Sequence, residues 1–317
     1  MTGSTDPSSY LAEHDERFTR ELLEFLAIPS ISALPDHAPH VAAAADWVAN
    51  RLRQAGVPTV EVLSAGGVPA VFGECLEAGE AAPTILVYGH FDTQPVDPVE
   101  LWTHPPFEPV IREERIYARG ASDDKGNMLI PILAAEAWLK TVGSLPINVK
   151  FLFEGEEEVG SPHVEEFVLE HQQRLACDYV VSADGGQWSE DQPNLLVGFK
   201  GLCAVEIDLV GPNRDLHSGQ YGGTVQNPIH ALARLIASMR DDEGRITIDG
   251  FYDQVITPGE SDREQIATIP QDDASFADGL GVDELFGEPG YSTLERAWCR
   301  PTLEVNGTWG GFTDDGV

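Results

Sequence analysis

The sequence has 317 residues, of which 42% are hydrophobic, and it carries 53 acidic against 19 basic side chains for a net charge of −34. Such a surface repels the phosphates of nucleic acids and of anionic lipids, so both are poor partners. No apolar run reaches the roughly 18 residues that a membrane-spanning helix needs.

The length is sufficient for two domains, each with its own core. Residues 1–13 are polar and are predicted to be disordered; they lack the basic and apolar regions of a secretory signal peptide. We therefore expect a cytoplasmic protein. Only four of the basic residues are lysines, and an acid-rich, lysine-poor surface suits a high-salt cytoplasm, where screening weakens the repulsion between like charges.

The first part of the chain predicts helices that alternate with buried strands. Amphipathic helices are expected from Asp15 to Ala27 and from Val41 to Ala55, the second closed by Gly56. Apolar runs predict strands at 59–63, 70–73, 84–88, 149–153 and 179–183, and a further helix is expected over 127–142. This alternation indicates an α/β sheet that is covered by helices on both sides.

The pattern changes near residue 200, where we place a domain boundary, with one domain over 14–200 and a second over 201–317. Residues 203–210 alternate between apolar and polar side chains, which predicts a strand with one wetter face. Asn227 and Pro228 then begin a helix whose apolar stripe extends to Met239. The acidic segment 240–300 gives no clear pattern.

Polar clusters follow the buried strands at the point where each strand ends, and another precedes the helix at 127–142. Ligands of open α/β sheets bind beyond the carboxyl ends of the strands, so these clusters are expected to converge. They contain His90, Asp92, Asp123, Asp124, Glu157, Glu158 and Asp184.

One histidine among several carboxylates, without a paired cysteine, suits a hydrolytic zinc, manganese or cobalt site. Of two adjacent acids, one can bind metal while the other accepts the proton of the attacking water. Asp92 follows His90 by two residues, so its carboxylate can accept the second imidazole N–H. Each cluster alone has an ordinary structural interpretation, as a buried histidine, a solvated acidic run or a helix cap, and their common context favours a site.

The sequence resembles the metallopeptidase family that includes aminoacylase-1, carnosinase-type dipeptidases, glutamate carboxypeptidase and succinyl-diaminopimelate desuccinylase. The resemblance extends from about residue 14 to the end. It is carried by the stretches LVYGHFDTQPV, WTHPPFEP, RIYARGASDDKGN, FEGEEEVGS and DLHSGQYGGTVQNP. The SDDKG and DLHSGQYGG motifs are most similar to the carnosinase-like dipeptidase branch.

This resemblance implies a zinc-peptidase-like catalytic domain, a mixed sheet covered by helices, and an inserted α+β dimerisation or lid domain. It also implies two divalent metal ions, with zinc as the first expectation and manganese or cobalt as alternatives. His90 and Asp184 would bind one ion, Asp123 would bridge both, and Glu158 would bind the other. The peptide bond between Asp123 and Asp124 is expected to be cis.

The resemblance assigns further roles to three residues. Glu157 would be the general base that passes the proton of the bridging water to the leaving amine, and Asp92 would orient the metal-binding histidine. His217, in the DLHSGQYGG motif, would stabilise the oxyanion from the second domain of a homodimer, a role of about 2.7–4 kcal/mol in other enzymes.

Members of this family continue well past 317 residues. Their chain returns to the catalytic sheet, where it supplies a final metal-binding histidine and residues that bind the substrate carboxylate. No histidine follows residue 300 here. We therefore expect the second domain to be incomplete and the 317-residue chain to be poorly active.

The sequence thus predicts a metal-dependent hydrolase that cleaves the amide bond of dipeptides or small N-acyl amino acids. Within this class, N-acyl amino acid deacylase or desuccinylase activity is the nearest alternative. A non-catalytic binding protein on a peptidase scaffold is the alternative from another class. The retention of Glu157 beside Glu158, together with His217, favours an enzyme.

Overall fold

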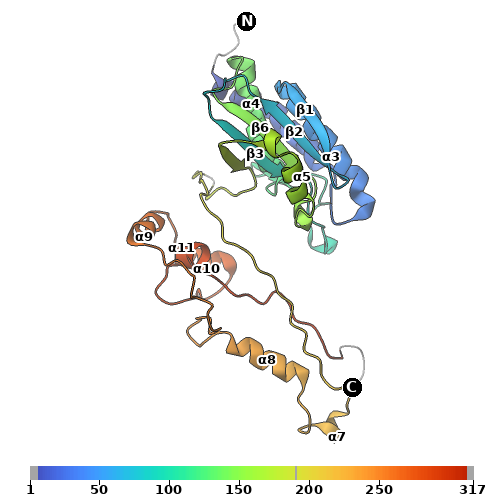
Figure 1. Ribbon diagram of the computed structural model, residues 1–317, viewed down its shortest axis with the longest axis vertical. Helices are drawn as coiled ribbons and strands as arrows, with labels where there is room; N and C mark the ends of the chain where they lie inside the picture. Colours follow the sequence, from blue (N-terminus) through green and yellow to red (C-terminus); the bar gives the residue numbers. More distant parts are fainter. Residues whose placement is uncertain (1–5, 190, 313–317) are drawn as a thin grey trace. The chain divides into compact units, whose positions relative to one another are not determined.

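The computed structural model describes residues 6–189 and 191–312, which form two compact units divided between Leu195 and Leu196 (Figure 1). This division lies close to the boundary that the change of pattern predicts near residue 200. Each unit is described by itself below. No helix among the described residues has both the length and the apolar character required to cross a membrane.

The first unit contains a five-stranded mixed sheet in the order β1-β2-β6-β3-β7. The β1-β2 and β2-β6 pairs are antiparallel, whereas β6, β3 and β7 are parallel. All five predicted strands are present, as β1 Thr59–Ala65, β2 Val68–Cys75, β3 Thr84–His90, β6 Asn148–Glu154 and β7 Tyr179–Ser182. The burial predicted for the last of them is wrong, because β7 lies at the edge of the sheet and its four residues are exposed. A separate hairpin pairs β4 Val110–Arg112 with β5 Arg115–Tyr117.

Helices cover both faces of the sheet, as the sequence predicts (Figure 1). Phe151 and Phe153 of β6 pack into the core beneath α2, α3 and α4, whereas Leu152 between them packs against Phe167 of α5 and Leu175 of α6. Successive strand residues point to opposite faces, so a strand that is apolar throughout must be covered twice. The helices are α2 Asp15–Leu26, α3 Ala38–Ala55, α4 Lys125–Thr141, α5 Val164–Glu170 and α6 Gln172–Leu175, with 3-10 turns η1 Pro35–His37, η2 Val99–Leu101 and η3 Glu157–Val159.

The prediction of disorder over residues 1–13 is wrong for its second half, because residues 7–13 form helix α1 Pro7–Glu13; residues 1–5 lie outside the described part of the chain. Asp6 caps this helix by accepting a hydrogen bond of 3.0 Å from the Ser9 backbone N–H. The Tyr10 hydroxyl donates at 2.8 Å to Glu136 of α4. The helix is therefore held by a tertiary contact that its own polar sequence does not reveal.

The described residues of the second unit, 196–312, form short helices joined by long irregular segments, and none of them forms a strand of a sheet. The prediction of a strand at 203–210 is therefore wrong. A segment with alternating apolar and polar residues forms a strand only where a neighbouring strand pairs with its backbone N–H and C=O groups. The predicted helix at Asn227 is present, and its cap accepts at 2.8 Å from the Ile229 backbone N–H. The helices are α7 Ser218–Tyr221, α8 Pro228–Ser238, α9 Glu260–Ala267, α10 Asp273–Leu280 and α11 Thr293–Cys299.

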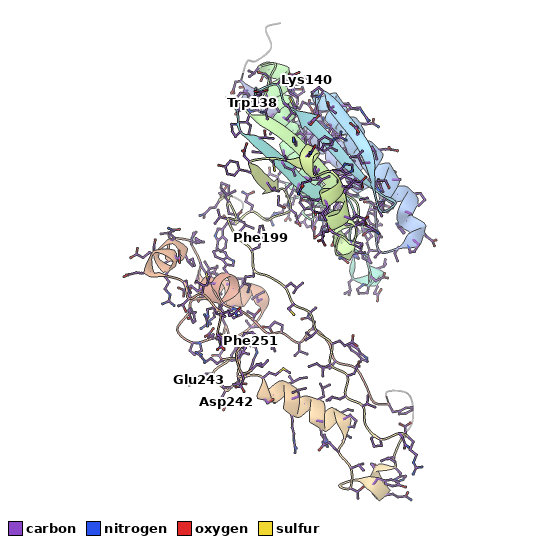
Figure 2. All side chains as sticks on the ribbon, in the orientation of Figure 1. Trp138, Lys140, Phe199, Asp242, Glu243 and Phe251 are labelled. Atoms are coloured by element: carbon purple, nitrogen blue, oxygen red, sulfur yellow. The ribbon has the colours of Figure 1, made fainter. Side chains whose placement is uncertain are left out.

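Two of the four lysines do not contribute positive charge to the surface. Lys125 and Lys150 are buried, and each ammonium group donates to two backbone carbonyls. Lys140, in the last turn of α4, is exposed (Figure 2). The surface is therefore even poorer in exposed ammonium groups than the sequence indicates.

We expect the thermal midpoint of unfolding to rise with salt, because screening weakens the mutual repulsion of the acidic side chains. Between 0.05 and 2 M potassium chloride, a rise of at least about 4 °C is expected, roughly 1–2 kcal/mol for a unit of this size. Calorimetry measures the midpoint, and sucrose of equal osmolality is the control. A midpoint that is independent of salt would contradict the proposed high-salt adaptation.

Candidate metal centre

His90 is the last residue of β3, and its side chain is fully buried. β6 and β7 lie parallel to β3 on either side. The loop that carries Glu157 and Glu158 follows β6, and the loop that carries Asp184 follows β7, so both begin at the same edge of the sheet as His90. The parallel topology thus produces the convergence that the sequence predicts.

The Nδ1 side of the His90 ring faces Asp92. The Nδ1 atom lies 3.3 Å from Asp92 Oδ1 and 3.2 Å from the Asp92 backbone oxygen. Both side chains are fully buried, so solvent does not compete with this contact. The arrangement suits the predicted role of Asp92, in which a carboxylate orients the imidazole.

Asp92 also makes a contact that sequence reasoning missed. Its two carboxylate oxygens accept hydrogen bonds from the backbone N–H groups of Glu157 and Glu158, at 3.2 and 3.1 Å. These N–H groups begin the turn η3, where no helical carbonyl is available to accept them. One buried carboxylate therefore connects the loop after β3 to the loop after β6.

The Nε2 side of His90 faces three carboxylates. Nε2 lies 3.0 Å from Asp123 Oδ1, 3.8 Å from Glu157 Oε2 and 3.9 Å from Asp184 Oδ2. Asp123 lies two residues before the start of α4, and its peptide bond to Asp124 is cis, as the resemblance implies. The side chain of Asp124 turns away from this cluster and accepts from the His90 backbone N–H at 3.1 Å.

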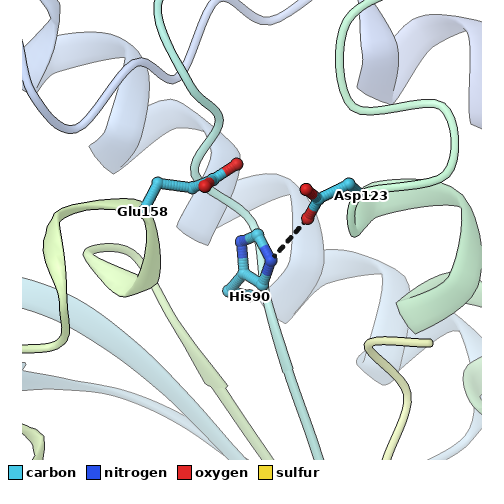
Figure 3. A group of neighbouring side chains, drawn as sticks. All are labelled: His90, Asp123 and Glu158. Atoms are coloured by element: carbon cyan, nitrogen blue, oxygen red, sulfur yellow. Dashed lines mark hydrogen bonds and ion pairs between the residues drawn. The ribbon is translucent and has the colours of Figure 1, made fainter. Parts of the chain in front are cut away.

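His90, Asp123 and Glu158 form a group that is able to hold a metal ion (Figure 3). Each offers one ligand atom, and these atoms all lie within 4.8 Å of one another. Asp184 is not part of this compact group, although its carboxylate reaches His90. An imidazole with carboxylates is the ligand set that zinc, manganese and cobalt accept in hydrolytic sites. The residues therefore fit a divalent metal.

The electrostatics of the cluster also favour a bound cation. Burial and the neighbouring acids raise the pKa of Glu157 and of Glu158 above the ordinary glutamate value. Burial lowers the pKa of His90, but the hydrogen bond and charge of Asp92, together with other carboxylates, outweigh it and raise this pKa to about 10. The contribution of the neighbouring carboxylates to these pKa values reflects an excess of negative charge, which a divalent cation would offset.

His217 belongs to the second unit and is exposed there. Its Nδ1 atom accepts a hydrogen bond of 3.0 Å from the Gly219 backbone N–H at the start of α7. A ring nitrogen that accepts a hydrogen bond carries no proton, so the proton of the neutral ring is on Nε2. The exposed Nε2–H is therefore available as a donor.

The chain is similar to known peptidases in its sequence. The sequence model of Peptidase family M20/M25/M40 matches residues 86–303. The Beta-Ala-His dipeptidase of Mus musculus is 30% identical over 325 residues, which cover 97% of this chain and 65% of the mouse protein. The Cys-Gly metallodipeptidase dug1 of Schizosaccharomyces pombe is 30% identical over 316 residues, which cover 95% of this chain and 66% of the yeast protein.

Two solved structures share the fold. The M20 family metallo-carboxypeptidase Sso-CP2 from Sulfolobus solfataricus superposes with a TM-score of 0.77 at 32% identity, over 95% of this chain and 67% of that one. Human carnosine dipeptidase 1 superposes with a TM-score of 0.74 at 26% identity, over 98% of this chain and 68% of the human chain. The chain spans 65% of the length of the mouse relative. The match over residues 86–303, which include the ligands of the candidate centre, shows that this chain belongs to Peptidase family M20/M25/M40.

Proposed function

We propose that the protein is a metal-dependent hydrolase that cleaves the amide bond of dipeptides. The observation that carries this proposal is the compact group of His90, Asp123 and Glu158 with the carboxylate of Glu157 beside it. The mouse and yeast relatives are named as dipeptidases, which supports the choice of substrate.

The proposed centre holds two divalent ions, with zinc as the first choice and manganese or cobalt as alternatives. His90 and Asp184 would hold one ion, Asp123 would bridge, and Glu158 would hold the other. Such ions polarise a substrate carbonyl and lower the pKa of bound water. Asp92 keeps the His90 ring in the orientation that directs Nε2 toward the carboxylates.

Glu157 is the proposed general base, which takes a proton from the attacking water and delivers it to the leaving amine. Among the described residues, no hydrogen bond restrains its carboxylate, which is 36% exposed and lies 3.8 Å from His90 Nε2. Burial and nearby acids raise the pKa of Glu157 toward the working range of a base. A carboxylate that is free to rotate can receive a proton on one side and release it on another.

The second unit is proposed to serve dimerisation. In the proposed homodimer, the Nε2–H of His217 would support the oxyanion in the site of the second copy. This assembly, like the cytoplasmic location, stays a prediction. The strongly acidic surface supports the expectation that nucleic acids and anionic membranes are not partners.

The first alternative is an N-acyl amino acid deacylase or desuccinylase, which would use the same centre on a different acyl group. The second is a binding protein without catalysis, which has no need for a base beside a ligand. Parallel assays with dipeptides and with N-acyl amino acids distinguish the first alternative from the proposed dipeptidase. Metal binding without turnover of either substrate class would favour the second.

Elemental analysis of the dialysed protein is expected to find bound divalent metal, because His90, Asp123 and Glu158 form a compact group of ligand atoms. Removal of the metal with a chelator should abolish dipeptide hydrolysis, and added zinc, manganese or cobalt should restore it. The variant His90→Ala serves as the control, because loss of its imidazole ligand should prevent restoration. Hydrolysis that survives complete metal removal would refute the proposal.

A further inference from the structure

Gln94 makes an unusual set of contacts with the metal-ligand candidate Glu158. It lies in the loop after β3, four residues beyond His90. Its side-chain Nε2 donates to Glu158 Oε2 at 2.8 Å and to the Glu158 backbone oxygen at 3.0 Å. Its backbone N–H donates to Glu158 Oε1 at 3.1 Å. A single residue thus holds both carboxylate oxygens and the main chain of Glu158.

These contacts restrain the Glu158 carboxylate but leave lone pairs on both of its oxygens for a metal ion. Each carboxylate oxygen has two lone pairs, so an oxygen that accepts one hydrogen bond can still bind a cation. The neighbouring Glu157 receives no such restraint on its carboxylate from any described residue, although Asp92 holds the backbone N–H of both. The two adjacent glutamates therefore differ in restraint, since the carboxylate of Glu158 accepts two hydrogen bonds from Gln94 and that of Glu157 accepts none from a described residue.

We propose that Gln94 is a positioning residue for metal binding, which acts through Glu158. The inference rests on the proposed metal centre. It gives a structural reason why Glu158 would be a ligand while the adjacent Glu157 would be the base. A ligand that is already oriented loses less conformational freedom when the ion binds. Residues that hydrogen-bond to metal ligands typically change metal affinity by about 10- to 100-fold when they are replaced.

The test replaces Gln94 with leucine, which has a similar size and no N–H donor, and separately with alanine. Dissociation constants for Zn²⁺ and Co²⁺ are measured on the dialysed protein by competition with a chromogenic chelator. With either metal, we expect the ion held by Glu158 to bind about 10- to 100-fold more weakly in the Gln94 variants. The ion held by His90 and Asp184 should bind as it does in the wild type. Gln54, exposed near the end of α3, provides matched controls in Gln54→Leu and Gln54→Ala.

A double-mutant cycle shows whether Gln94 acts through Glu158. In a Glu158→Ala background, Gln94→Leu should have no further effect on metal affinity, because the restrained carboxylate is already absent. Equal thermal midpoints of the Gln94 variants and the wild type would show that the loss is local.

Each remaining outcome overturns the inference. If the wild type binds metal and the Gln94 variants match the Gln54 controls, Gln94 has no positioning role and the metal centre stands. If Gln94→Leu weakens affinity equally in the Glu158→Ala background, Gln94 acts by another route. If the wild type binds no divalent metal, the proposed centre is wrong and the inference is wrong with it.

Discussion

Replacement of Glu157 by glutamine is expected to lower the hydrolysis of a dipeptide by about 10²- to 10⁴-fold while the protein keeps its metal. Glutamine has the shape of glutamate but cannot accept a proton from water. The carboxylate of Glu157 makes no hydrogen bond with another described residue, so its removal leaves the ligands in place. Turnover at saturating substrate and metal content by elemental analysis measure the two effects.

The adjacent residue is the matched control for this prediction. Glu158→Gln makes the same chemical change one position along the chain, but it removes a ligand atom from the group with His90 and Asp123. We expect this variant to lose metal as well as turnover. Loss of metal from Glu157→Gln, or full turnover by it, would show that the proposed roles of the two glutamates are wrong.

Breaking a buried ionic cluster beneath α1 is expected to destabilise the first unit strongly. Glu136 of α4 accepts from Arg17 at 2.5 Å, from the Tyr10 hydroxyl at 2.8 Å and from Arg51. Arg51 Nε lies 2.8 Å from a carboxylate oxygen of Glu21. The side chains of Arg51 and Glu136 are only 2% and 3% exposed, so neither can replace its partner with water.

We expect Glu136→Ala to lower the free energy of unfolding by about 3–5 kcal/mol, because it leaves the guanidinium of Arg51 buried with one partner fewer. Urea denaturation followed by circular dichroism measures the loss. Arg53→Met, an exposed change on α3, is the control and should cost less than about 1 kcal/mol. An effect of Glu136→Ala as small as that of Arg53→Met would contradict the prediction.

The same cluster gives the stability a defined dependence on pH. Burial raises the pKa of Glu136, but hydrogen bonds from Arg17 and Tyr10 and the charge of Arg51 outweigh it, so this pKa lies below its ordinary value of 4.5. A depressed pKa contributes stability that is fully present above 4.5 and is lost as the pH falls through the folded-state value. Glu136→Gln should therefore be destabilised at neutral pH and lose less further stability than the wild type on acidification.

The sequence by itself was sufficient to predict the five strands of the sheet and the convergence of polar side chains at one of its edges. Continuous apolar runs predict strands that are buried on both faces, which is correct for β6 but not for β7, whose residues are exposed at the edge of the sheet. The polar clusters at the ends of these runs predict a common edge because parallel strands all end on the same side. His90 and Glu158 meet there for that reason, and Asp123 joins them from the loop before α4.

Only the tertiary structure decided how the site is held. The contacts of Asp92 with the backbone of Glu157 and of Gln94 with Glu158 join loops that are more than 60 residues apart, and no local pattern records them. Helix α1 likewise depends on the bond between Tyr10 and Glu136. The strand predicted at 203–210 is absent for the same physical reason. Periodicity determines which side chains share a face, whereas a hydrogen bond also requires a partner that only the folded chain brings into place.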